Sequence, residues 1–507
     1  MKNSIKKRYK KIVVLFSALL IFTLSLSCSS DYLETDPTTA VSEETAFSTA
    51  SNLMAIINGM HRDLYTRQNT RQGEGGQGAI MIMMDALGED LVFTSAAGGW
   101  FTTTAKWQDP VNDGANYNIF PFQFYYALIR NANMVIANGP NVPSSNATDT
   151  ETIKKAIGEA YAFRAFCYYM LVQIYAKRYV PNTTNSQLGV PLRLVDDEIP
   201  LARNTVEEVY TQINSDLNEA LTRLNSSRTT KSHFNDKVIL GLRARVALTQ
   251  GNYALAASSA KLARADFPLM SDTTYSLGFN YGSLASNGEW MWGTTIATVD
   301  QSDNPANFGA YMSRNYNSVG VRGGPKAISK KLYAMFPSTD VRTKLFDPTG
   351  AHTALALPST YSKFPYTNQK FLAVSTSDSR VDIPYMRGAE MYLIEAEALA
   401  RSNNEVGSKL VFNEFAKKRN PSYTGATTTG AAYITEILNS RRLELWGEGF
   451  RFLDLKRLDQ GLDRTGSNHN ANVINNVFTV SNTDNKWQWL IPRDEIIANP
   501  LIEQNPL

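Results

Sequence analysis

The stretch that decides the fold is RRLELWGEGFRFLDLKR, residues 441–457. It mixes basic and acidic side chains with apolar ones, and glycines place flexible joints inside it. On a helix, residues three apart can pair, as Arg441 and Glu444 are. The same spacing separates Glu448 from Arg451. Because a planar guanidinium suits a carboxylate, we interpret the stretch as structural, tying helices together by Arg–carboxylate bonds, and favour this over an active site.

A second motif closes the chain as WQWLIPRDEIIANPLIEQNP, residues 487–506. Together the two stretches resemble the SusD/RagB family of outer-membrane nutrient-binding lipoproteins. The matching residues are Glu444, Glu448, Gly449, Arg451, Asp454, Leu455 and Arg457 in the first, and Ile491, Pro492, Glu495, Asn499, Pro500, Gln504, Asn505 and Pro506 in the second.

The resemblance extends upstream over nearly the whole chain after its leader. It includes GEAYAFRAFCYYMLVQIYAKRYVP at 158–181, MYLIEAEALA at 391–400 and YLETDPTTAVSEETAF at 32–47. One departure is the Tyr-Ala-Lys-Arg at 175–178, where a glycine commonly follows the tyrosine, and we expect it to alter only a helix end. The loop-rich part of the chain is the least similar to the family, which leaves the ligand open.

Apolar residues recur at steps of three and four over much of the chain, which predicts helices. The clearest ranges are 43–66, 120–138, 151–178 and 205–224. Thr205 with Glu208 has the spacing of a capping box at the start of the last one.

Two segments, 237–265 and 390–419, are predicted to be helical hairpins with short turns. Their small Ala and Gly residues let helices approach closely, and their length is similar to that of a tetratricopeptide repeat. Ordinary antiparallel helices are the alternative. The predicted fold class is mainly α, with tetratricopeptide-like hairpins that carry a loop-rich, irregular ligand-binding region.

The expected organisation has three parts: a lipoprotein signal peptide at 1–27, a lipidated N-terminus and tether at 28–42, and a single SusD-like domain at 43–507. Within that domain, tetratricopeptide-like helices are expected at about 151–265 and 385–450. Gly, Asn, Ser, Thr and aromatic residues dominate about 266–384, so this range is predicted to hold the binding loops.

The leader carries six positive charges before an apolar run at 12–27, as in a secretory signal. The run ends on Cys28, which resembles the lipidated cysteine of a bacterial lipobox. Two or more acyl chains on that residue, palmitate among them, would hold the protein stably on the outer membrane. A retained membrane anchor is the alternative. Acids shortly after Cys28 favour display on the cell surface.

Charge argues against nucleic acid as a partner. The whole chain has 50 basic and 47 acidic residues, and removal of the six basic residues of the leader leaves 44 against 47, or −3.

Metal and cofactor motifs are missing from the sequence. The four histidines lie far apart along the chain, so we expect no metal site and no cofactor. GEGGQG at 73–78 fits a dinucleotide-binding pattern in letters only, because no strand precedes it, and we expect a flexible loop. Cys167 is expected to be a buried, unreactive thiol.

Aromatic residues give the candidate ligand site. Flat rings cover the faces of a sugar while polar side chains bond its hydroxyl groups. The candidates, in order, are Trp290, Trp292, Trp100, Trp107, Tyr316 and Tyr311. Trp290 and Trp292 would share one face of an extended strand. The alternative is that these rings pack loops onto helices.

The resemblance implies a protein that captures a nutrient, most simply an oligosaccharide, and delivers it to a SusC-like TonB-dependent transporter without catalysis. The expected place is the outer membrane, lipid-anchored and facing outward. An oligopeptide ligand is the first alternative. A glycoside hydrolase and a helical scaffold without a small ligand are the alternatives from other classes.

Overall fold

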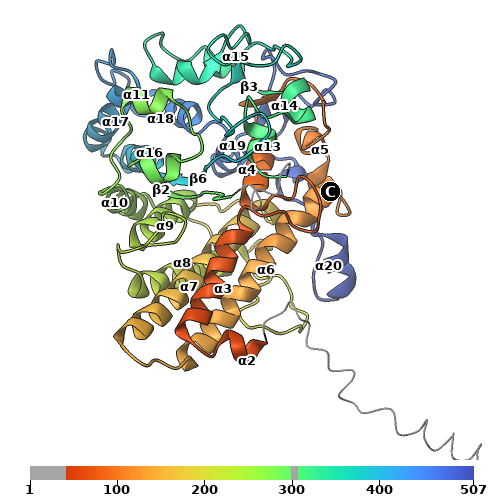
Figure 1. The fold of residues 1–507 in the computed structure, drawn as a ribbon, viewed down its shortest axis with the longest axis vertical. Coiled ribbons are helices and arrows are strands. Elements are labelled where there is room, and N and C mark those ends of the chain that lie inside the picture. Colours follow the sequence, from red (N-terminus) through yellow and green to blue (C-terminus); the bar gives the residue numbers. More distant parts are fainter. Residues whose placement is uncertain (1–41, 299–305) are drawn as a thin grey trace, which may run out of the picture.

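The structure is a computed structural model that describes residues 42–298 and 306–507. One half consists of long helices, and the other of short helices, strands and loops (Figure 1). Cys28, predicted to carry the lipid, lies outside the described residues.

The first long helices form at three of the predicted ranges. They are α3 (Ala50–Asp63), α6 (Asn116–Asn138) and α7 (Ala147–Tyr175). The predicted helix at 43–66 is wrong as one element, because α2 (Glu43–Ala46) is separate from α3. Thr49 starts α3 as its N-cap by accepting a hydrogen bond from the Asn52 N–H.

The predicted hairpins are confirmed. The capping box of Thr205 and Glu208 opens α8 (Val206–Arg223). Helices α9 (Asp236–Gln250) and α10 (Tyr253–Ala263) turn at a single left-handed glycine, Gly251. Downstream lie α16 (Gly388–Arg401), α17 (Glu405–Arg419) and α18 (Gly430–Glu444).

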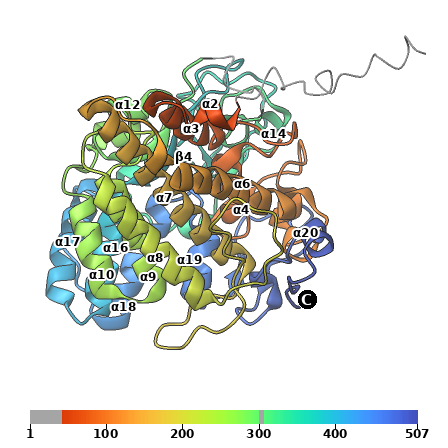
Figure 2. The same cartoon turned by 90° about the horizontal axis from the view of Figure 1, so that it is seen from below.

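These helices form one continuous layer. Figure 2 shows α17, α16, α10, α9, α8, α7 and α6 side by side in that order, and neighbours in this order pack on one another. Since α10 packs on α16, hairpins distant in sequence share one array, as in repeat proteins.

The range 266–384 has the predicted irregular texture. Its helices are short: α11 (Asp272–Ser276), α12 (Ser283–Ser286), α13 (Gly309–Met312), α14 (Val319–Gly323) and α15 (Lys330–Tyr333). Its strand β2 (Trp290–Thr294) pairs antiparallel with β6 (Ile383–Arg387).

Three strands of this range join an earlier one in a small antiparallel sheet. The order is β1 (Leu91–Phe93), β3 (Lys326–Ile328), β5 (Thr367–Asn368) and β4 (Phe346–Asp347). The remaining elements are α4 (Gly76–Ala86), α5 (Thr102–Ala105), α19 (Arg451–Arg457), β7 (Leu462–Asp463), β8 (Thr479–Val480) and α20 (Arg493–Ala498).

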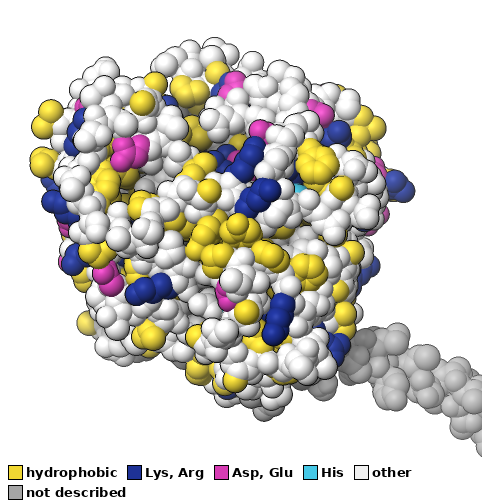
Figure 3. Space-filling view, turned by 90° about the horizontal axis from the view of Figure 1, so that it is seen from above, with side chains coloured by type: hydrophobic (Ala, Val, Ile, Leu, Met, Phe, Trp, Pro, Cys, Tyr) yellow, Lys and Arg dark blue, Asp and Glu magenta, His cyan; other side chains and the backbone are white. Residues whose placement is uncertain are grey.

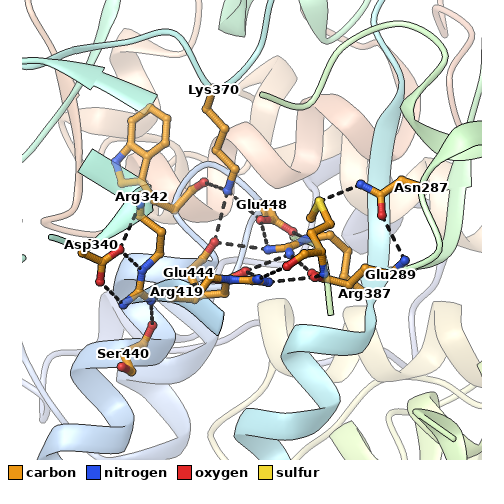
Figure 4. A network of polar contacts seen from close by, with 12 residues as sticks. Asn287, Glu289, Asp340, Arg342, Lys370, Arg387, Arg419, Ser440, Glu444 and Glu448 are labelled. Atoms are coloured by element: carbon orange, nitrogen blue, oxygen red, sulfur yellow. Dashed lines mark hydrogen bonds and ion pairs between the residues drawn. The ribbon is translucent and has the colours of Figure 1, made fainter. Parts of the chain in front are cut away.

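A buried cluster of charged side chains connects the two halves (Figure 4). We call it the buried ion cluster; it contains Arg342, Arg387, Arg419, Lys370, Asp340, Glu289, Glu444 and Glu448. The four basic and four acidic groups balance, and each residue is at most 5% exposed. Balance matters because an unpaired charge is costly away from water.

Arg387 at the end of β6 is the centre of this cluster. Its guanidinium donates to Glu289 at 2.5 Å, to Glu444 at 2.9 Å and to Glu448 at 2.6 Å. Arg419 of α17 donates to Glu289 at 2.8 Å and to Glu444 at 3.0 Å. Burial raises the pKa of Glu444, but the neighbouring arginines outweigh it and hold that pKa well below its usual range.

The structural role expected for residues 441–457 is confirmed, but both expected pairs are wrong. Arg441 donates to Asp454 at 2.8 Å, and Arg451 donates to Glu89 at 3.0 Å. Helix α18 ends at Glu444 and the chain turns through left-handed glycines, so the spacing of an exposed helix does not apply.

We expect Arg387→Met to lower the free energy of unfolding by about 3–5 kcal/mol, because it leaves four buried carboxylates with only three basic partners in the cluster. Urea denaturation followed by tryptophan fluorescence measures this. The matched control is Arg130→Met, whose exposed pair with Asp196 should contribute at most about 1 kcal/mol. Equal, small changes in both variants would contradict the central role of Arg387.

Candidate functional site

The loop-rich half carries hydrophobic side chains along the middle of one face, with Lys and Arg beside them (Figure 3). A cleft of about 920 Å³ lies at the loops around α5, in the same half (Figure 1). We call it the Trp100 cleft; it is lined by Gln72, Glu74, Gly98, Gly99, Trp100, Thr103, Trp107, Gln108, Asp109, Val111, Asn112, Ala115, Asn116 and Tyr117.

Besides Tyr117, Trp100 is a partly exposed aromatic side chain of this cleft. Gly98 and Gly99 precede it with φ of 78° and 71°, a left-handed turn that few other residues adopt. Its ring centroid lies 5.9 Å from that of Tyr311, so the structure brings these two predicted residues together. Tyr311 is buried, and its hydroxyl accepts a hydrogen bond from the Gly73 N–H at 3.0 Å.

A second pair of rings supports this wall from behind. Phe101 stacks on Tyr117 with centroids 5.1 Å apart and meets Tyr311 edge-on at 5.2 Å. The wall therefore draws on three segments of the chain, and its rings hold one another in place.

Two buried acids supply hydrogen-bond acceptors. Asp109 Oδ2 accepts from the hydroxyl groups of Thr104 at 2.5 Å and Thr103 at 3.1 Å. Glu74 Oε2 accepts from Asn69 Nδ2 at 3.1 Å, and its Oε1 lies 3.7 Å from Arg71 Nη1. Burial raises the pKa of both Asp109 and Glu74.

The first two candidates from the sequence are in the core. Trp290 and Trp292 are 0% exposed. Trp290 stacks on Phe279 at 5.7 Å, whereas Trp292 packs against Phe166 and donates from Nε1 to the Ser232 carbonyl. They were predicted to contact the ligand from one face of an extended strand, but all five residues of β2 are buried and its pairing is irregular between the two rings.

The other two candidates are also buried. Trp107 contributes to the lining of the cleft, but its ring packs on Trp487 at 4.8 Å and it donates to the Leu87 carbonyl. Tyr316 is 9% exposed and is not part of the cleft lining. A ligand contact by Tyr316 stays a prediction.

Sequence reasoning missed Glu74, Asp109, Asn116 and Tyr117. The GEGGQG segment at 73–78, expected to be a flexible loop, is buried and opens α4. A Cβ atom on Gly76 would lie 2.4 Å from the Leu64 carbonyl oxygen. The density of glycines was the available signal, since it marks a close approach of backbones.

Although the histidines lie far apart along the chain, the fold brings two of them together. His61 Nε2 lies 2.7 Å from Glu159 Oε2, and His233 Nδ1 lies 3.0 Å from the same oxygen. Of the groups within 42–298 and 306–507, this one has the ligand atoms to hold a metal ion, all within 4.8 Å. In the present geometry Glu159 accepts hydrogen bonds from both rings and from the Phe234 N–H.

Cys167 is buried and unpaired with another cysteine, and burial holds the pKa of its thiol well above the usual value, as expected for an unreactive thiol. In the part of the chain that the structure describes, no helix has the length and apolar character to cross a membrane.

Comparison with known proteins gives consistent matches. Residues 31–248 match a SusD-like family described as starch-binding and associating with the outer membrane, and residues 301–507 match the SusD family. The chain is 24% identical to the SusD-like protein P38 of Formosa agariphila, over 98% of this chain and 99% of that protein.

Solved structures share the fold. A SusD-like carbohydrate binding protein from Bacteroides vulgatus has a TM-score of 0.76 at 23% identity, covering 90% of this chain and 98% of that one. A protein described as a laminarin-binding SusD-like protein has a TM-score of 0.65 at 21% identity, covering 90% and 99%. These likenesses confirm the mainly helical fold.

We expect Trp292→Ala to lower the free energy of unfolding by about 3–5 kcal/mol, because it leaves a cavity in the core. Trp100→Ala should change it by less than about 1 kcal/mol, since the ring is partly exposed and its loss opens no closed cavity. Urea denaturation of both variants measures the difference. A large loss in Trp100→Ala would make Trp100 a core residue and contradict its place in an open cleft.

The His61–Glu159–His233 group predicts acid sensitivity. Burial lowers the pKa of His61 to about 4. Burial raises the pKa of Glu159, but hydrogen bonds from His233 and His61 outweigh it and lower that pKa to about 2. Both folded-state values lie below the unfolded ones, so the unfolded chain binds more protons and stability falls as pH falls from about 6.5 to 2.

The His61→Phe variant tests this, because it removes the first group to titrate. Wild type should lose about 3 kcal/mol more than the variant between pH 6.5 and pH 4. Denaturant midpoints measured across that range give the two curves. Parallel curves would show that His61 does not carry the loss.

Proposed function

Because the chain belongs to the SusD family, we propose that it captures an oligosaccharide in the Trp100 cleft and delivers it to a SusC-like TonB-dependent transporter. The family is one of carbohydrate-binding proteins associated with the outer membrane. The observation that supports this cleft is Trp100 itself, a partly exposed ring that lines the same cleft as two buried carboxylates.

The chemistry of the cleft suits a sugar. A pyranose ring exposes C–H groups on its faces, which pack on a flat indole. Its hydroxyl groups at the edge meet Asp109 and Asn116, which offer acceptor and donor atoms. Capture needs binding alone, so no bond is broken in the proposed role.

Attachment to the membrane is proposed through Cys28, joined to acyl chains after removal of residues 1–27. The tether at 28–42 would leave the folded part free to move over the transporter. The proposed transfer to a barrel transporter comes from the family resemblance, and the layer of helices α6–α10 and α16–α17 supplies a broad surface for such a partner.

The test uses residues 29–507 in native gels that contain soluble glycans, followed by calorimetry with oligosaccharides of each retarding glycan. Trp100→Ala should weaken glycan binding about tenfold or more. Burial of the apolar surface of the indole ring against the sugar contributes about 1.5–3 kcal/mol to the binding free energy. Tyr281→Ala is the matched control, since Tyr281 is exposed on the loop-rich half and is not part of the cleft lining.

Three outcomes contradict the proposal. Unchanged glycan binding by the Trp100→Ala variant would show that the Trp100 cleft is not the binding site. Binding of oligopeptides without any glycan retardation would favour the peptide-binding alternative. Cleavage of a glycan by the purified protein would favour a glycoside hydrolase.

A further inference from the structure

The charged side chains that line the Trp100 cleft are both acids. Glu74 is 1% exposed and Asp109 is 2% exposed, and the cleft lining contains no Lys or Arg among its described residues. Neutral amide and hydroxyl groups donate hydrogen bonds to both acids, and Arg71 is a basic neighbour of Glu74 alone.

The two acids differ in how far their charge is balanced. Arg71 lies 3.7 Å from Glu74, but its side chain is half exposed and also donates to Asn116 at 2.7 Å. Within the described residues, no basic side chain lies within 4.0 Å of the Asp109 carboxylate. Asp109 is therefore a negative group held by two neutral hydroxyls, both on Oδ2.

The two hydrogen bonds leave Asp109 Oδ1 without a donor from the described residues. A ligand hydroxyl that donates to a carboxylate makes a charge-assisted hydrogen bond, which is stronger than one between neutral groups. A ligand carboxylate or sulfate cannot donate, and it brings a further negative charge into a space that is partly closed to water. The same two acids thus attract hydroxyl groups and repel anions.

We propose that the Trp100 cleft selects uncharged glycans over glycans that carry uronate or sulfate groups. This inference rests on the proposed function and goes beyond it, because it names the class of glycan. The carboxylates act at short range in the cleft, and the repulsion between them and an anionic ligand weakens as salt rises.

Burial raises the pKa of both acids. Their surroundings already disfavour negative charge, so a third negative group is disfavoured further. The phenol of Tyr117 has a raised pKa for the same cause, burial, and both acids add to it, which keeps it a neutral hydrogen-bonding group.

The experiment compares matched pairs of oligosaccharides that differ only in charge. The probes are gluco- and manno-oligosaccharides of several linkages and the same oligomers oxidised at C6 to uronates. Calorimetry on residues 29–507 at low salt should give affinities at least about tenfold weaker for the oxidised member of each binding pair. The difference should shrink at 0.5 M salt.

Three variants locate the cause. Glu74→Gln and Asp109→Asn remove one charge each and should each narrow the difference between the neutral and the oxidised oligomer. Two variants are needed because Asp109 accepts a buried hydrogen bond from Thr104 and a part-buried one from Thr103. Asp109→Asn is used only if its denaturation midpoint shows a folded protein. Glu151→Gln is the control, an exposed acid outside the cleft, and should leave the difference unchanged.

The outcomes separate this inference from the proposed function. Equal or tighter binding of the oxidised oligomers overturns the selectivity and leaves glycan capture standing. The selectivity is also overturned if neither Glu74→Gln nor Asp109→Asn narrows the difference in affinity between the neutral and the oxidised oligomers. If no oligosaccharide binds but a Lys-containing peptide does, and Glu74→Gln weakens it, both proposals fall.

Discussion

The fold depends on the pairing of Arg387 with three carboxylates in a place closed to water. Glu289 lies just before β2, Glu444 ends α18 and Glu448 follows in the turn, so one guanidinium joins the strand pair to the last helices of the array. Removal of any member would leave a buried charge in the cluster unbalanced, which is costly away from water.

The same region also positions the Trp100 cleft. Directly after Glu448, the N–H of Gly449 donates to Asp85 at 2.9 Å, on α4. A Cβ atom on Gly449 would lie 2.7 Å from Met81, so the turn lies flat against that helix. Helix α4 begins in the glycine-rich loop that carries Glu74 and whose Gly73 N–H meets Tyr311. A continuous set of contacts thus runs from the buried ion cluster to the wall of the cleft.

The helices were predictable from sequence because their apolar stripes depend on local spacing, as in α8 with its capping box. The cleft was not predictable from sequence, because its residues come from segments that are distant along the chain and adjacent only in the folded protein. Composition marks Trp290 and Trp100 equally, yet one is enclosed by β6 and Phe279 while the other follows two glycines at the surface. The Arg441–Glu444 pair failed for a related reason, since spacing along one helix says nothing of a carboxylate on another segment.

In the proposed site, the aromatic ring and the two acids have different roles because of where they lie in the cleft. A partly exposed ring supplies affinity for any flat apolar face, and it discriminates little between sugars. Asp109 and Glu74 are themselves buried, and hydrogen bonds from Thr104 and Asn69 hold their carboxylates in place. Under the proposed function, a cleft that holds its ligand mainly against partly exposed rings favours moderate affinity and fast release. The proposed transfer of the ligand to a partner would require both properties.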